Sequence, residues 1–477
     1  MQSLDRILDR FEKVSAIPRG TKQESQIRQW LRDWATELGL ANQVDSVGNL
    51  VIYVPASPGF EGRPPLILQG HLDMVWQKTP DSDHDFTRDP IRVLRDSDWL
   101  KADRTTLGAD NGIAIALMMA LAEEATASHP PLELLLTVEE EVGIGGADFL
   151  DPELLTAKTL INLDSEEDGV FTVGCAGGGS VLIHLPVTWE SASPDMEFFL
   201  LKVSGLQGGH SGGDINKQRA NANKVLARTL DFIQVKVPLQ LAALKGGSAR
   251  NAIPRDAQAA FACPKGQSAV CREQVERFAE TLASEYSKTE ASLALSVEQA
   301  NSSERIVSLV DSQTAVRLLL ALPNGVAEMS AEVEGFVETS SNVGVVELLE
   351  DGLHVISNHR SSVSSRLEEI NRRVEAIAQF AGAQTSRTKI YAPWQPDLDS
   401  PLLKKCEAVY EAQFGHQPEV HLTHGGLECG IISDRCGGLD TISLGPTILN
   451  PHSPDERLYI PSVANVWQLL TALLAAE

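Results

Sequence analysis

The stretch Thr105-Thr106-Leu107-Gly108-Ala109-Asp110-Asn111-Gly112-Ile113 sets one carboxylate, Asp110, among small and turn-forming residues. An apolar run with helical character, from Ile113 to Leu121, follows it directly. This order predicts a loop-to-helix junction with Asp110 at the junction and its backbone tightly packed. On both sides of the stretch lie apolar segments typical of buried strands.

Each of these apolar segments ends in residues of metal-ligand type. The residues are His71 and Asp73 after segment 65–69, Glu139, Glu140 and Glu141 after 132–137, Asp164 after 159–163, and His452 in a later proline-flanked loop. Taken singly, each is more often a solvated turn or loop residue than a ligand. Taken together, they indicate one site, because ligands in open α/β sheets bind at the carboxyl ends of the strands.

The candidate ligands are two histidines and three carboxylates, with no thiolate, and such a set suits a two-metal hydrolytic centre. In such centres a carboxylate bridges two ions about 3.5–4 Å apart. We assign His71 and Asp164 to one ion, Glu141 and His452 to the other, and Asp110 to both.

Two further acidic residues have predicted roles that need no bond to a metal. Asp73 stands two residues after His71, where it can hold the imidazole in one tautomer. Glu140 neighbours a ligand without being one, so it can take a proton from water and pass it to a leaving amine.

Composition excludes several classes of protein. A formal net charge of −25 disfavours nucleic acid and anionic membranes as partners. No apolar run is long enough to cross a bilayer, and the N-terminus lacks the pattern of a signal peptide. The six cysteines are scattered, which favours reduced thiols and a cytoplasmic protein over a disulfide framework.

The 477 residues predict two domains and an α/β fold. Alternating strands and helices predict a catalytic domain with a mixed sheet flanked by helices, in two parts, 1–186 and 391–477. Residues 187–390 are expected to form an inserted lid of two α+β units. Helices are expected, among other places, over 146–155 and 214–234.

Several motifs resemble those of bacterial aminoacyl-histidine dipeptidases, also called Xaa-His dipeptidases or peptidase D. The motifs are Gly70-His71-Leu72-Asp73-Met74-Val75, the 105–112 stretch, Glu140-Glu141 with Gly143, Asn162-Leu163-Asp164-Ser165-Glu166-Glu167 and His452-Ser453-Pro454-Asp455-Glu456. This family belongs to the di-zinc metallopeptidase superfamily that includes acetylornithine deacetylase and carboxypeptidase G. The resemblance extends over nearly the whole chain; one departure is Glu139, where Asp is commoner.

The resemblance implies hydrolysis of dipeptides, including Xaa-His dipeptides such as carnosine, by water activated at two Zn²⁺ ions. Mn²⁺ and Co²⁺ stay open as working metals. It implies the roles described above for the five metal ligands, for Asp73 and for Glu140. It also implies a cis peptide bond after Asp110.

In the lid, the resemblance implies that His210 stabilises the carbonyl oxygen and that Asn251 and Arg360 bind the substrate's terminal carboxylate. It also implies that the backbone at Gly426 contacts substrate. With two α+β units in one lid, we expect His210 to act within its own chain, whether or not the protein is a homodimer.

Two other functions are compatible with the same residues. One is an N-acyl amino-acid deacylase of the same superfamily, with the same metals and a different acyl pocket. The other is a metal-binding scaffold without catalysis, which the spare carboxylate of Glu140 argues against.

Overall fold

The computed structural model describes residues 2–124, 126–331 and 333–476, which fall into two compact units. The first unit comprises the residues up to Cys175, Trp394–Leu422 and those from Leu427 onward. The second comprises Ala176–Pro393 and Thr423–Gly426. The division therefore falls earlier than the expected boundary after residue 186. The reason is that strand β9 (Gly177–Leu185) pairs on both sides with strands of the second unit.

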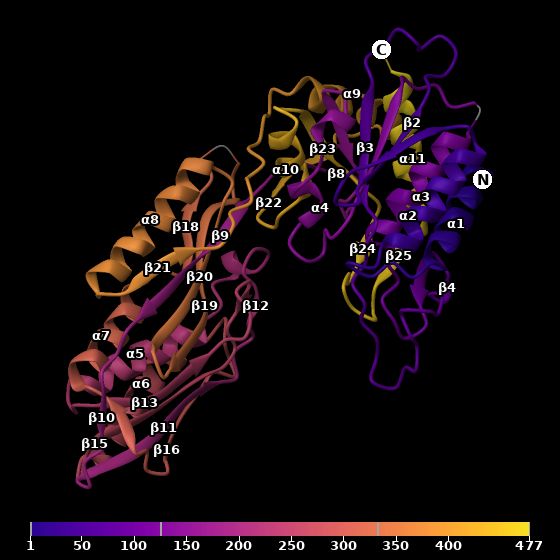
Figure 1. Cartoon of the computed structure of the whole chain (residues 1–477). Helices are drawn as coiled ribbons and strands as arrows, with labels where there is room; N and C mark the ends of the chain where they lie inside the picture. The colour runs from indigo at the N-terminus through magenta and orange to yellow at the C-terminus, as the bar shows by residue number, and fades with distance from the viewer. Residues whose placement is uncertain (1, 125, 332, 477) are drawn as a thin grey trace. The chain divides into compact units, whose positions relative to one another are not determined.

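The first unit is built around an eight-stranded mixed sheet (Figure 1). Its strands, in spatial order, are β1 (Ala41–Val44), β2 (Leu50–Val54), β6 (Leu132–Thr137), β3 (Leu66–His71), β7 (Thr159–Asn162), β23 (Asp440–Ser443), β8 (Val170–Cys175) and β22 (Glu419–Thr423). The four consecutive strands β6, β3, β7 and β23 run parallel to one another. Their carboxyl ends therefore meet at one edge of the sheet, and the predicted α/β class is confirmed.

Helices cover this sheet, and a small second sheet of β24 (Ile448–Leu449), β25 (Arg457–Tyr459), β5 (Trp99–Ala102) and β4 (Val93–Asp96) completes the unit. The helices are α1 (Gln2–Ser15), α2 (Ser25–Glu37), α3 (Ala109–Glu123), α4 (Gly145–Asp148), α9 (Pro401–Phe414), α10 (Glu428–Arg435) and α11 (Ile460–Ala475). Helix α3 packs against both α1 and β3 and is buried from Asn111 to Leu121. Its apolar residues therefore surround the helix instead of forming one stripe.

The prediction of a helix over 146–155 is wrong. Helix α4 ends at Asp148, and only a short 3₁₀ turn, Pro152–Leu154, follows it. Pro152 has no N–H to continue a helix, and the side chain of Asp151 accepts the N–H of Glu153 to start the new turn.

The second unit contains a nine-stranded sheet whose recorded pairings are all antiparallel. Its strands, in spatial order, are β16 (Ala294–Gln299), β11 (Met196–Ser204), β15 (Ala257–Pro264), β13 (Gln240–Gly246), β19 (Val337–Leu349), β20 (Gly352–Ser361), β9 and β21 (Gln384–Arg387), with β18 (Gly325–Met329) beside β19. The helices are α5 (Ala222–Gln234), α6 (Ser268–Glu285), α7 (Leu309–Ala321) and α8 (Ser364–Phe380). Pairing of β13 with β19 joins the two expected α+β groups into one sheet.

The helix expected over 214–234 begins eight residues late, at Ala222. Asn221 caps it, because its side chain accepts the N–H groups of Asn223 and Lys224. Residues before it form only a 3₁₀ turn, Ile215–Lys217. Each unit has its own hydrophobic core. Among the described residues, no helix is both long enough and apolar enough to span a membrane.

Candidate metal centre

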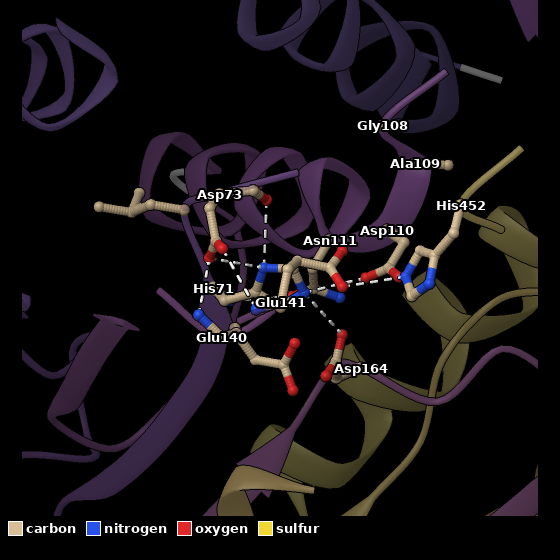
Figure 2. Close-up of polar contacts among 12 residues, drawn as sticks. His71, Asp73, Gly108, Ala109, Asp110, Asn111, Glu140, Glu141, Asp164 and His452 are labelled. Carbon is tan, nitrogen blue, oxygen red and sulfur yellow. Dashed lines mark hydrogen bonds and ion pairs between the residues drawn. The ribbon is translucent and has the colours of Figure 1, made fainter. Parts of the chain in front are cut away.

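Parallel strands of the first unit bring the predicted ligands to one edge of its sheet. His71 is the last residue of β3, Glu140 and Glu141 follow β6, and Asp164 follows β7. Because β3 lies between β6 and β7, these residues converge although they are far apart in sequence. Figure 2 shows their side chains pointing toward one another.

Asp110 lies at the start of α3, at the predicted loop-to-helix junction. Its backbone has extended values (φ −75°, ψ 110°), and the peptide bond between Asp110 and Asn111 is cis, as the resemblance implied. The Asn111 side chain accepts the N–H of His71 and donates to the carbonyl oxygen of Leu163. The junction is therefore fastened to the ends of both β3 and β7.

The side chain of Asp110 is shared between two groups of donor atoms. Its Oδ1 lies 2.9 Å from His71 Nε2, which is 3.4 Å from Asp164 Oδ1. Its Oδ2 lies 3.0 Å from His452 Nε2, which is 3.0 Å from Glu141 Oε2. The structure thus brings together all five predicted ligands, in the two sets that the sequence suggested.

Asp73 connects His71 to the loop after β6. Its Oδ1 lies 3.3 Å from His71 Nδ1, the ring nitrogen opposite the one that faces Asp110. The carboxylate also accepts the N–H groups of Glu140 and Glu141. One buried carboxylate therefore orients the imidazole and positions the segment carrying two more site residues.

The electrostatics of the cluster favour a bound cation. Burial alone would lower the pKa of His71, but the charge of Asp164 and the hydrogen bond to Asp110 raise it well above its usual value. Hydrogen bonds to Asp110 and Glu141 raise the pKa of His452 to about 11. Both imidazoles therefore sit where carboxylates attract positive charge, and a divalent ion would supply that charge in place of their protons.

The donor chemistry gives a second test of the fit. Glu141 Oε1 is buried and has no hydrogen-bond partner among the described residues. Such an oxygen is costly unless something pairs with it. Two imidazole nitrogens and three carboxylates are also the ligands that suit zinc and similar divalent ions. The residues present therefore fit two metal ions that share Asp110.

Glu140 lies beside the ligands in a half-buried position. One of its carboxylate oxygens lies within 4.8 Å of ligand atoms of His71 and Glu141 (Figure 2). Burial, followed by the charges of Asp164, Glu428 and Glu141, raises the pKa of Glu140 well above its usual value despite the opposing effect of His71. A carboxylate whose pKa is raised binds a proton more strongly, which suits a group that accepts one.

Four predicted residues belong to the second unit, where the structure groups them in one region. His210 pairs with Ala252, so it lies beside Asn251, whose carbonyl oxygen accepts the N–H of Ser211. Arg360 Nη1 lies 3.4 Å from the carbonyl oxygen of His424, two residues before Gly426. That same carbonyl oxygen borders Gly212, in the His210 loop, where a Cβ atom would approach it to 2.8 Å.

Sequence reasoning missed three buried residues around the first-unit cluster. Arg19 is fully buried and donates to the carbonyl oxygens of Leu72, Asp73 and Gly108. Burial lowers its pKa, and the charge of Glu456 is the largest opposing effect. No motif marked Arg19, because its partners are backbone groups far away in sequence.

Glu456 ends one of the motifs given above and Glu428 stands two residues after Gly426, but neither was assigned a role. The Glu456 carboxylate accepts the N–H groups of the four consecutive residues from Leu107 to Asp110. The Glu428 carboxylate accepts from Gln69 and Thr137 within the sheet, and burial raises its pKa to about 8. An acidic residue close to predicted site residues was the only available signal in each case, since its partners are set by the fold.

Comparisons with known proteins agree with this geometry. The profile of the peptidase family M20/M25/M40 matches residues 67–476. The chain is 41% identical over 466 residues to the cytosol non-specific dipeptidase of Escherichia coli K12, covering 98% of this chain and 96% of that protein. The crystal structure of aminoacylhistidine dipeptidase from Vibrio alginolyticus superposes with a TM-score of 0.88 at 39% identity, covering 98% and 96% of the two chains. Aminopeptidase PepT from Bacillus cereus, at 16% identity and a TM-score of 0.56 over 99% and 98%, shares the fold.

Proposed function

Because the chain belongs to the peptidase family M20/M25/M40, we propose that it is a metal-dependent dipeptidase acting on unblocked dipeptides, including Xaa-His dipeptides such as carnosine. The observation that carries the proposal is the sharing of Asp110 between two donor sets, with Glu140 beside them. The names of the Escherichia coli and Vibrio relatives support the dipeptide as substrate. The first of these names also supports a cytoplasmic location.

We propose that the two sets hold two Zn²⁺ ions, with Mn²⁺ and Co²⁺ as alternatives. His71 and Asp164 would hold one ion, Glu141 and His452 the other, and Asp110 both. When bound, such ions polarise a carbonyl group and lower the pKa of water from about 15.7 to about 7. The protein's contribution is to fix these five side chains before substrate arrives.

In this mechanism Glu140 moves the proton. Its carboxylate takes a proton from the attacking water and delivers it to the nitrogen of the departing amine. Burial favours this role, because a raised pKa makes the carboxylate a stronger base. Asp73 keeps His71 in one orientation through Nδ1, so that Nε2 stays directed at Asp110.

The roles proposed for the second unit rest on the resemblance and on residue chemistry. His210 would stabilise the carbonyl oxygen as negative charge develops. Arg360, with Asn251, would bind the terminal carboxylate, and a guanidinium suits such bidentate contact. Tyr391 supports Arg360, because Arg360 Nη1 donates to its hydroxyl oxygen at 2.9 Å.

The deciding experiment is a panel of substrates offered to protein reconstituted separately with Zn²⁺, Mn²⁺ and Co²⁺. The panel contains carnosine, other Xaa-His dipeptides, dipeptides without histidine, and N-acetyl amino acids. Release of free amino acids from the dipeptides supports the proposal. Release of acetate with intact dipeptides would instead make the protein an N-acyl amino-acid deacylase, and no product with any metal would leave a binding scaffold.

A further inference from the structure

Two histidines and an aspartate meet at one end of the β19–β20 hairpin, in the second unit. His184 lies on β9 and His354 on β20, and the two residues are direct partners in the antiparallel ladder. Asp351 stands in the turn that connects β19 to β20. The proposed dipeptidase mechanism uses none of these three residues.

Their donor atoms converge on a small volume. His354 Nε2 lies 2.9 Å from Asp351 Oδ1, and His184 Nε2 lies 3.5 Å from Asp351 Oδ2. The imidazole rings are stacked, with centroids 4.7 Å apart and planes 29° apart. Both rings therefore present Nε2 to the same carboxylate.

The turn that carries Asp351 is held in place from several sides. The carbonyl oxygen of Asp351 lies 3.1 Å from His184 Nε2, and the indole N–H of Trp189 donates to the carbonyl oxygen of Glu350. Gly352 has φ +150°, and a Cβ atom there would overlap the carbonyl oxygen of Leu185. The Trp189 contact and the close approach of Gly352 to Leu185 hold the turn beside β9 without the three proposed ligand side chains.

We propose that His184, Asp351 and His354 form a binding site for a divalent transition-metal ion of the zinc type. Zinc binds imidazole nitrogen and carboxylate oxygen at about 2.0–2.2 Å, so its ligand atoms lie within about 4.4 Å of one another. The three donor atoms already lie within 4.8 Å of one another. The distances from the Asp351 carboxylate oxygens to the two imidazole nitrogens, 2.9 and 3.5 Å, already fall within the limit for zinc.

The ladder partners of the two histidines do not compete with the three proposed ligands for the ion. Across the sheet, His354 is the ladder partner of Glu347, but the Glu347 carboxylate is paired with Lys245 Nζ at 2.9 Å. On the other side, His184 is the partner of Gln384, which carries no charge. The carbonyl oxygen of Asp351 or a water molecule would complete a four-coordinate ion.

The test measures Zn²⁺ bound per chain by equilibrium dialysis of the full-length protein, first treated with a chelator. The variants are His184→Gln and His354→Gln. The matched control is His421→Gln, because His421 is also an exposed histidine paired with a carboxylate, that of Glu419 at 3.0 Å. We expect each site variant to bind one Zn²⁺ fewer than wild type and the control to bind the same number. Equal binding by wild type and both site variants overturns the proposal.

A second measurement needs no substitution. Modification of wild-type histidines by diethyl pyrocarbonate, followed by mass spectrometry, is carried out with and without Zn²⁺. Slower modification of His184 and His354 with Zn²⁺, and an unchanged rate at His421, supports the site. Unchanged rates at His184 and His354 overturn it. The difference in bound Zn²⁺ between wild type and the site variants does not depend on how many ions the first-unit cluster holds. A negative result for this site therefore leaves the proposed dipeptidase function standing.

Discussion

Replacing Glu456 by Gln tests how the loop carrying Asp110 is held. The carboxylate of Glu456 is buried and accepts four backbone N–H groups. Oε2 accepts from Leu107 at 2.7 Å and from Gly108 at 3.0 Å. Oε1 accepts from Ala109 at 2.7 Å and from Asp110 at 3.3 Å.

Glutamine has nearly the same shape but keeps only one acceptor oxygen, so two of the four N–H groups lose their partner. A buried donor left without a partner costs about 1–3 kcal/mol, which gives about 2–6 kcal/mol for the two. The substitution also removes the negative charge that contributes most to offsetting the burial of Arg19. The loss in the free energy of unfolding should therefore lie toward the upper part of this range.

The assay is chemical denaturation of the full-length variant, followed by tryptophan fluorescence, with metal content measured alongside. Asp455→Asn is the matched control, because Asp455 is the exposed neighbour of Glu456 and its substitution should change stability by less than about 0.5 kcal/mol. We expect Glu456→Gln to lose metal together with stability, since Asp110 shares this loop. A variant as stable as the control would refute the reasoning, because it would mean that the four hydrogen bonds do not hold the loop.

Three further predictions follow from the site and its surroundings. Glu140→Gln should keep its metal and lose about 10²–10⁴-fold in kcat, whereas Glu141→Gln should lose metal; elemental analysis showing the reverse contradicts the assignment. Tripeptides, and dipeptides with an amidated C-terminus, should be poor substrates if Arg360 binds a terminal carboxylate close to the scissile bond. Efficient cleavage of an amidated dipeptide would show that Arg360 does not have this role. Burial lowers the pKa of His359 from 6.5 to about 4. This difference between the unfolded and folded states corresponds to about 3 kcal/mol in the free energy of unfolding. This contribution to stability is fully present above pH 6.5 and is lost as the pH falls toward 4, because the unfolded chain takes up the proton first. The thermal unfolding temperature of His359→Gln should therefore depend less on pH in that range than that of wild type. Equal dependence would show that His359 is not the source of the pH effect.

Local sequence predicted much of the candidate ligand set that the structure brings together. The strands that precede His71, Glu140 and Asp164 could be recognised as short apolar runs, and β6 has the predicted bounds. Strands of this kind in α/β order place their last residues at one sheet edge. Asp110 was recognisable because its neighbours are small and an apolar helix follows it. These signals are local, so a pattern within about ten residues carries each of them.

Element boundaries were less predictable where a distant contact or one cap decides them. The expected helix includes residues 214–221, but the side chain of Asn221 starts α5 at Ala222. The expected boundary after residue 186 missed β9, because only pairing with β20 and β21 assigns that strand to the second unit. Neither a cap nor a strand partner is encoded in the periodicity of the segment itself.

The supports of the site were decided by tertiary structure alone. Arg19 binds carbonyl oxygens of residues 53 to 89 positions away, and Glu456 binds N–H groups 346 to 349 positions away. Backbone groups are identical at every position, so the sequence around them cannot indicate which ones a buried charge will reach. The sequence by itself therefore determined which side chains can bind metal, and the fold decided which buried charges hold them in place.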